Sequence, residues 1–241
     1  MSRVLILLPQ AGFDPTEVAV PWKALVDAGH EVIFATETGA EAACDPVTLT
    51  GQGLPVYARF LRAHEASRAL YADMAASPAF RTPVSWADVI ASDYALIHFP
   101  GGHAPDMRPY LESALVQDVA RAAFAAGRPV SAICHGVVAL ARAGVLKGYR
   151  TTALTAIMEN VAVWLTRGAL GLHYRTYPQG VEEEVRAALA RPEDFARGPI
   201  LGGYATRERP SAGFIVRDRN YVSARWPGDA WTLAAEMLRM L

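Results

Sequence analysis

The sequence has little cysteine and almost no net charge, and both shortages narrow what the protein can be. Its 241 residues include only two cysteines, Cys44 and Cys134, too few for the disulfide framework of a small secreted domain. The formal net charge is -1, so no large positive field is present to attract nucleic acid or an anionic membrane surface. We therefore expect a small-molecule partner, no nucleic acid and no membrane.

The opening segment MSRVLILLPQ also lacks a long hydrophobic run. Its apolar stretch is shorter than the core of a signal peptide, about 7–15 residues, and than a spanning helix of about 20 residues. We interpret it as the first strand of a cytoplasmic protein. The chain is nevertheless 52% hydrophobic, enough to bury the core of a single α/β domain over residues 1–241.

Strand-like and helix-like segments alternate along the chain. The runs RVLILLP, EVIFATE, YALIHFPGG and PVSAIC predict strands, whereas PYLESALVQDVARAAFAAGR predicts one amphipathic helix. Near the end, GFIVRDRNYVSARWP predicts two strands joined at 218–220, followed by a closing helix. Parallel neighbours need crossover connections, so the order predicts a flavodoxin-like, doubly wound, mainly parallel sheet with helices on both faces.

Two stretches, 52–90 and 156–198, fit this alternation less well. Both are mostly helical or loop-like, and the second carries Trp164, Tyr174 and Tyr177. We predict that they are insertions forming a small helical cap over one end of the sheet. The simplest role for the aromatic side chains is to fill the seam between cap and core.

Three strand ends carry residues suited to chemistry. GFDPTE follows the first strand and places Glu17 in the first turn of a helix, PGGHAPD follows YALIHF, and CHG follows PVSAI. Ligands of open parallel sheets bind beyond the carboxyl ends of the strands. These three corners are therefore expected to meet at one edge and form a site.

The CHG corner has the spacing of a nucleophile elbow, with small residues two positions before and after Cys134, namely Ala132 and Gly136. At a helix N-terminus the thiolate form of the cysteine is favoured. His135 would exchange protons with the sulfur and would need a further group to fix its tautomer. The alternatives are a small buried thiol and a packed histidine.

The other two corners supply a carboxyl group and backbone donors. Glu17 in a partly dry pocket would have a raised pKa and could pass a proton to the substrate, although acidic residues also favour helix starts. Gly101 and Gly102 offer N–H groups that, with the N–H of His135, could cradle an oxyanion, unless the turn needs glycine only for its conformation. His103 would line the same pocket, whereas His98 and Cys44 are interpreted as structural.

These motifs resemble the ThiJ/PfpI family of the class I glutamine amidotransferase-like superfamily. AICHG after a strand, PGGH before it, GFDPTE near the start and the final RNYVSARWPGDA carry the resemblance over nearly the whole chain. Amidotransferases pair their cysteine with a later His-x-Glu, but the only later histidine, His173, begins HYR. The superfamily name is therefore expected to describe ancestry alone.

The insertions and the GFDPTE form resemble the branch of heat-shock chaperones with glyoxalase III activity. In that branch the third catalytic residue is an acid preceded by a Gly-x-x-x-Thr stretch, and GYRTTALTAIMEN fits with Gly148, Thr152 and the acid Glu159. The resemblance thus implies a catalytic role for Glu159, with a surface carboxylate as the alternative. Ala104 replaces the glycine that usually follows PGGH, which changes the shape of the pocket. A homo-oligomer, most simply a dimer, is also implied.

The Cys134 corner together with the resemblance therefore implies a Cys134-dependent enzyme acting on small reactive carbonyls. The most specific expectation is glutathione-independent conversion of methylglyoxal or glyoxal to the hydroxy acid, a glyoxalase III-like lyase activity. We expect no metal or organic cofactor, because the chemistry needs none and no ligand cluster has metal spacing. Two alternatives remain, a cysteine amidase or peptidase and a stress-response holdase chaperone with an exposed apolar patch.

Overall fold

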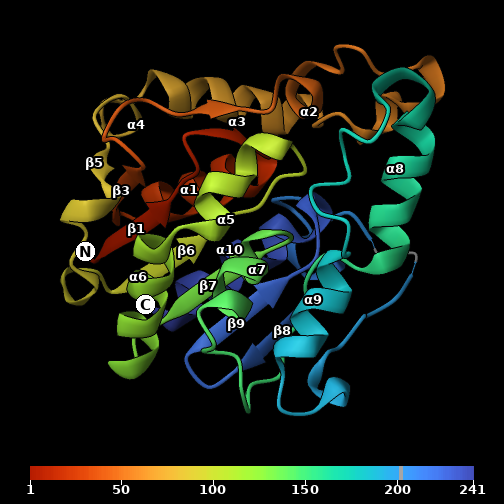
Figure 1. Ribbon diagram of the computed structural model, residues 1–241. Helices are drawn as coiled ribbons and strands as arrows, with labels where there is room; N and C mark the ends of the chain where they lie inside the picture. The colour runs from red at the N-terminus through yellow and green to blue at the C-terminus, as the bar shows by residue number, and fades with distance from the viewer. Residues whose placement is uncertain (201–202) are drawn as a thin grey trace.

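A seven-stranded sheet forms the centre of the protein (Figure 1). The computed structural model describes residues 1–200 and 203–241. β8 pairs antiparallel with β9, and the other neighbours in this sheet are parallel. The strand order is β5 (Val84–Ser85), β3 (Glu31–Thr36), β1 (Arg3–Leu7), β6 (Leu96–Phe99), β7 (Val130–Ile133), β9 (Tyr221–Ala224) and β8 (Ile215–Asp218).

The direction of the connections decides which helices cover which face. The chain moves from β1 to β3 in one direction and from β6 to β7 in the other, so right-handed crossovers place their helices on opposite faces. Accordingly, α1 (Pro15–Asp27) packs against the C-terminal α10 (Ala230–Met240), and α6 (Ala114–Ala125) packs against α7 (Gly136–Arg142). The predicted doubly wound, mainly parallel fold is confirmed.

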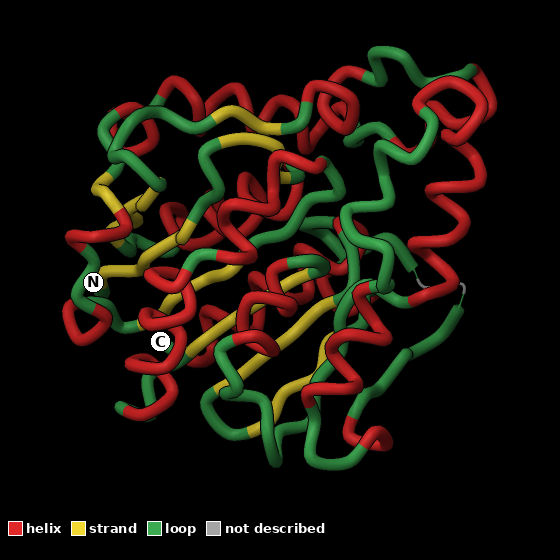
Figure 2. Tube along the Cα trace, in the orientation of Figure 1, coloured by secondary structure: helices red, strands yellow, loops and turns green. Residues whose placement is uncertain are grey.

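The remaining helices, short strands and loops surround this central sheet (Figure 2). Two short strands form a separate parallel pair, β2 (Ala11–Phe13) and β4 (Ala43–Cys44). The other α-helices are α2 (Pro46–Thr50), α3 (Glu65–Ala76), α4 (Pro78–Arg81), α5 (Arg108–Glu112), α8 (Ala156–Leu170) and α9 (Val181–Ala188). The 3-10 turns are η1 (Val56–Leu61), η2 (Trp86–Asp88), η3 (Ala91–Asp93), η4 (Pro105–Met107), η5 (Pro192–Asp194), η6 (Pro210–Ala212) and η7 (Pro227–Asp229).

Two local predictions differ from the structure. The helix expected over 109–128 is divided into α5 and α6, because Ser113 is extended and its hydroxyl caps α6 by accepting a hydrogen bond from the N–H of Val116. Segment 52–90, expected to be helical or loop-like, also supplies the edge strand β5 beside β3.

Segments 52–90 and 156–198 pack around the central sheet and its helices. α3 runs along α1, and α8 stands at the outer edge and contacts η1 (Figure 1). Across residues 1–200 and 203–241, no helix combines the length and the apolar character needed to cross a membrane.

Candidate functional site

The three predicted corners meet at the carboxyl ends of β1, β6 and β7. The parallel register aligns these strands, since Ile6 pairs with His98 and His98 pairs with Ser131. The backbone N–H of Asp14, just before α1, donates to the carbonyl of Gly101 after β6 at 2.9 Å. Gly101 in turn approaches the β7 corner, because a Cβ added there would lie 2.7 Å from the backbone N of His135.

Cys134 occupies a sharp elbow between β7 and α7. Its φ of 57° is positive, a conformation that costs a non-glycine residue free energy and that often marks a functional position. Gly136 makes the turn possible, because a Cβ at this position would lie 2.2 Å from the carbonyl oxygen of Phe99. The Cys134 side chain is fully buried.

His135 contacts the sulfur directly. Its Nδ1 lies 3.5 Å from Cys134 Sγ, and its Nε2 lies 3.1 Å from Thr176 Oγ1. The Thr176 hydroxyl donates a hydrogen bond to the carbonyl of His103 at 2.8 Å, so it accepts a hydrogen bond from the Nε2–H of His135. This arrangement leaves the Nδ1 lone pair of the neutral imidazole facing the thiol.

Glu17 lies on α1, and its side chain is fully buried. Its Oε2 accepts a hydrogen bond from the N–H of Gly101 at 2.9 Å, and its carboxyl group interacts with the Cys134 thiol. Oε1 has no hydrogen-bond partner among the residues that the structure describes. Burial and the nearby Asp14 raise the pKa of Glu17 well above its usual value, which favours the protonated acid.

Burial also raises the pKa of the Cys134 thiol, and the neighbouring Glu17 adds to the effect. The helix N-terminus lowers the pKa of the thiol, but desolvation raises it. The prediction of a favoured thiolate considered only the first effect. The two groups titrate as a pair, because the buried site disfavours two adjacent negative charges. When Glu17 keeps the proton, its acid group can stabilise the thiolate of Cys134.

Asp14 is a site residue that sequence reasoning missed. Its Oδ1 caps α1 by accepting hydrogen bonds from Thr16 N–H at 2.8 Å and Glu17 N–H at 3.2 Å. Burial raises its pKa to about 7. The available signal was Asp directly before Pro15, an N-cap followed by proline at the first helical position.

The glycine turn after β6 serves packing and positioning as well. A Cβ at Gly102 would lie 2.3 Å from the carbonyl oxygen of Gly12, so this close approach requires glycine. The N–H of Gly101 donates to Glu17, which leaves the N–H groups of Gly102 and His135 as the candidates for the predicted oxyanion cradle. His103 stacks edge-on against His135 and Tyr174, with ring centroids 4.9 Å and 5.3 Å away.

Glu159 lies elsewhere than the resemblance implied. It is buried in the first turn of α8, where its Oε2 accepts a hydrogen bond from Val181 N–H at 2.9 Å and its Oε1 pairs with Arg175 at 3.4 Å. Within residues 1–200 and 203–241, no hydrogen bond joins Glu159 to His135. The partner that fixes the His135 tautomer is Thr176, for which the sequence gave no signal.

The two residues interpreted as structural, His98 and Cys44, are buried. His98 bonds Ser131 Oγ at 2.7 Å and the carbonyl of Glu17 at 3.0 Å, and thereby ties α1 to the sheet. Burial lowers the pKa of His98 to about 4. Burial also raises the pKa of the Cys44 thiol to about 11.

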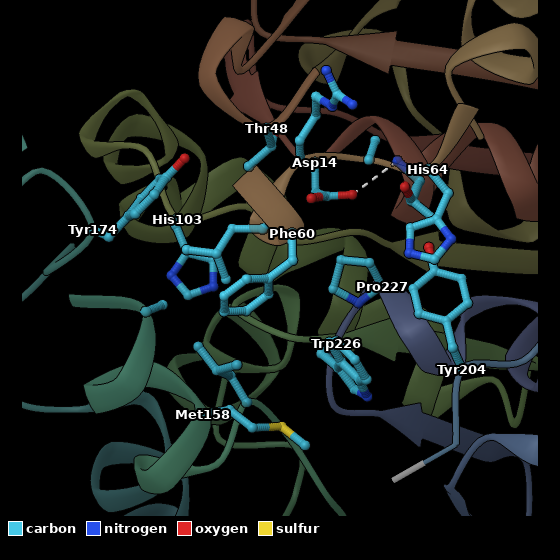
Figure 3. Close-up of a pocket in the computed structure, with 16 residues that line it drawn as sticks. Asp14, Thr48, Phe60, His64, His103, Met158, Tyr174, Tyr204, Trp226 and Pro227 are labelled. Atoms are coloured by element: carbon cyan, nitrogen blue, oxygen red, sulfur yellow. Dashed lines mark hydrogen bonds between the residues drawn. The ribbon is translucent and has the colours of Figure 1, made fainter. Parts of the chain in front are cut away.

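A cavity of about 120 Å³ opens beside this cluster (Figure 3). Its walls are mainly apolar and aromatic, with the Asp14 carboxyl as a polar group inside. His103 lines the cavity and also touches His135, so it connects the cavity with the Cys134 corner. Segments 52–90 and 156–198 both contribute walls, with Phe60, Leu61, Arg62, Ala63 and His64 from the first and Met158, Ala162 and Tyr174 from the second.

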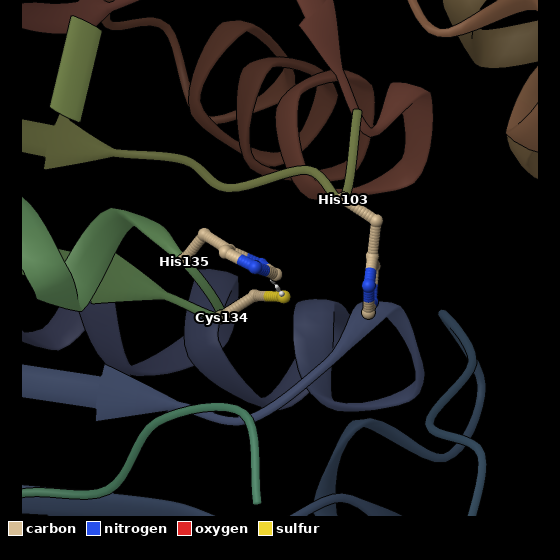
Figure 4. Close-up of side chains that lie close together, drawn as sticks. All are labelled: His103, Cys134 and His135. Carbon is tan, nitrogen blue, oxygen red and sulfur yellow. Dashed lines mark hydrogen bonds between the residues drawn. The ribbon is translucent and has the colours of Figure 1, made fainter. Parts of the chain in front are cut away.

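Three donor side chains, His103, Cys134 and His135, form a cluster that the sequence did not reveal (Figure 4). One nitrogen of each imidazole and the Cys134 sulfur all lie within 4.8 Å of one another. The expectation that no ligand cluster has metal spacing is therefore corrected by the fold, which brings together residues from two loops.

Comparison with known proteins places the chain in a family. The model of the ThiJ/PfpI family-like group matches residues 8–199. "Deglycase PfpI" of Pyrococcus furiosus is 25% identical over 239 residues, which are 98% of each chain. An uncharacterized protein of Schizosaccharomyces pombe is 29% identical over 168 residues, 66% of this chain, and the match spans only 61% of that relative's length.

The solved structures show the same fold. Glyoxalase III from Candida albicans superposes with a TM-score of 0.66 and 18% sequence identity, over 100% of this chain and 97% of that one. The matched residues 8–199 include all three corners, from Asp14 and Glu17 through the glycine turn to Cys134 and His135. The chain belongs to the ThiJ/PfpI family, as its motifs predicted.

Proposed function

We propose that the protein is a Cys134-dependent enzyme that converts small reactive carbonyls such as methylglyoxal or glyoxal to the hydroxy acid without glutathione. The observation that carries the proposal is the grouping of a buried thiol with a buried carboxyl of raised pKa and an oriented imidazole. The neighbouring cavity of about 120 Å³ suits a small substrate better than an extended peptide. The structural neighbour from Candida albicans is named glyoxalase III, which supports carbonyl chemistry at this site.

The proposed reaction uses these groups in sequence. His135 Nδ1 takes the thiol proton, and the Cys134 sulfur adds to the aldehyde carbon, giving a hemithioacetal once the oxygen is protonated. Protonated Glu17 supplies the proton to that oxygen, and the resulting Glu17 carboxylate then removes the proton from the same carbon. His135 gives the thiol proton to the second oxygen, and protonation of the adjacent carbon by Glu17 yields the thioester. Water hydrolyses the thioester, which releases the hydroxy acid and restores the thiol.

A hydrolytic function is the second candidate, supported by the name "Deglycase PfpI" of the Pyrococcus furiosus relative. The same thiol could attack a carbonyl adduct on an amine, and the alternative of an amidase or peptidase uses the same nucleophile. A peptide substrate would need a groove wide enough for a chain, whereas the cavity beside His103 is only about 120 Å³.

The chaperone alternative has one supporting observation. Ile157, Val161 and Trp164 are spaced to share one face of α8 and are 46%, 46% and 76% exposed. An exposed apolar stripe of this kind is what a holdase or a homodimer contact would use. Replacement of Trp164 by Glu, with client aggregation and oligomeric state as readouts, separates these roles from catalysis.

Lactate formation from methylglyoxal without glutathione tests the proposed function. Wild type and the matched control Cys44→Ala should both form lactate, whereas Cys134→Ala should form none. Glu17→Gln should bind substrate but lose turnover, because the amide cannot exchange the proton. Lactate production by Cys134→Ala at the wild-type rate, or its absence in wild type, would overturn the proposal.

A further inference from the structure

The cluster of His103, Cys134 and His135 has the makings of a metal site. Cys134 and His135 come from the end of β7, and His103 comes from the glycine turn after β6 (Figure 4). The sulfur and one nitrogen of each ring lie within 4.8 Å of one another. No function assigned above uses the three side chains together as ligands.

One distance within the cluster, between Cys134 and His135, matches that of two zinc ligands. Bonds of about 2.05 Å to an imidazole nitrogen and about 2.3 Å to a thiolate, at a tetrahedral angle, separate the two donor atoms by about 3.6 Å. The observed distance from Cys134 Sγ to His135 Nδ1 is 3.5 Å. His103 lies within 4.8 Å of the other two donors and would have to move closer on binding, and the fourth position would remain open to water.

The surroundings prepare the nitrogens to bind a cation. Thr176 accepts a hydrogen bond from the Nε2–H of His135, which leaves the Nδ1 lone pair free, and such an outer hydrogen bond is typical of metal-binding histidines. Nδ1 of His103 is buried and has no hydrogen-bond partner in the described part of the chain.

We propose that His103, Cys134 and His135 bind one Zn²⁺ ion, reversibly, with the cavity beside His103 as the entry path. Binding releases the thiol proton to solvent and forms one Zn–S and two Zn–N bonds, with no change in oxidation state. The bound ion occupies the sulfur lone pair, so it blocks addition to a carbonyl. This inhibitory consequence rests on the proposed function, whereas the binding itself does not.

Cobalt titration tests the site, because Co²⁺ adopts the same geometry and reports on it by absorbance. Wild type should bind one Co²⁺ with a thiolate charge-transfer band and the d–d bands of a four-coordinate ion, and Zn²⁺ should displace it. Cys134→Ala should lose the charge-transfer band. His103→Ala and His103→Gln should weaken binding by more than tenfold, and Thr176→Val by about 10- to 100-fold.

Two controls make the outcome decisive. His30→Ala, remote from the cluster, and Cys44→Ala should bind Co²⁺ as wild type does, and near-ultraviolet circular dichroism should confirm that every variant is folded. Equal affinity of wild type and both folded His103 variants, or no stoichiometric complex in wild type, would overturn the proposal. Metal binding without carbonyl turnover would uphold the metal site and refute the proposed function. Carbonyl turnover without metal binding would uphold the proposed function and refute the metal site.

Discussion

The buried carboxyl of Asp14 should make the protein less stable as the pH rises, and Asp14→Asn should remove this effect. The pKa of Asp14 is raised by burial from 3.8 to about 7. Between these values the unfolded chain loses a proton that the folded protein keeps, so stability falls with pH until about 7. At about 1.36 kcal/mol per pKa unit, the full penalty is about 4 kcal/mol. Asn caps helices about as well as Asp, so the amide should keep the α1 cap.

Urea unfolding of wild type and Asp14→Asn from pH 5 to pH 8 measures this penalty. The variant should gain about 2 to 3 kcal/mol of unfolding free energy relative to wild type over that range, because about that part of the penalty develops above pH 5. The matched control Asp73→Asn, at an exposed position on α3, should show a difference that does not change with pH. A constant difference for Asp14→Asn, or one that grows toward acid pH, would refute the reasoning.

Three further substitutions test separate parts of the account. Gly136→Ala should destabilise the fold by about 3 kcal/mol, since its Cβ would meet the Phe99 carbonyl. The control Gly168→Ala in α8, where a Cβ would meet nothing within 4 Å, should stabilise the fold by about 0.5–1 kcal/mol. Equal denaturation midpoints for the two variants would contradict this. Thr176→Val should lower kcat about tenfold with little change in KM, since a buried N–H left unpaired costs about 1–3 kcal/mol, and Thr176→Ser should restore it; a change in KM alone would argue against positioning of His135. Arg225→Met should cost about 3–5 kcal/mol, because it leaves the fully buried Asp229 unpaired; a loss below about 1 kcal/mol would show that the pair is dispensable.

The Cys134 elbow and the neighbouring site residues Glu17 and His103 could be predicted because their sequence signals are local. A buried strand, Cys134 and a glycine two residues later specify a strand-to-helix turn with little help from the rest of the chain. Strand alternation then places the ends of β1, β6 and β7 at one edge of the sheet, which brings Glu17 and His103 to the same place. Both inferences depend on short stretches whose geometry is fixed by backbone sterics and crossover handedness.

The partners of the site residues could not be predicted, because they depend on how segment 156–198 packs against the rest of the chain. Thr176 reaches His135 from a loop after α8, across 41 positions of sequence. Glu159 lies in the first turn of α8, where it contacts Val181 N–H and Arg175 instead of His135. The pKa of Cys134 was likewise misjudged, since helix-terminus arguments can be made from sequence but desolvation requires the folded structure.

The central claim is that Cys134 forms a covalent intermediate with the carbonyl substrate. Acid-quenched single-turnover mass spectrometry of the digested protein tests it most directly, because a thioester survives acid. The account predicts a mass increase of one methylglyoxal on the peptide containing Cys134, appearing before lactate and disappearing at the turnover rate, with none on the peptide containing Cys44. Lactate formation with no adduct on Cys134 at any time would contradict it.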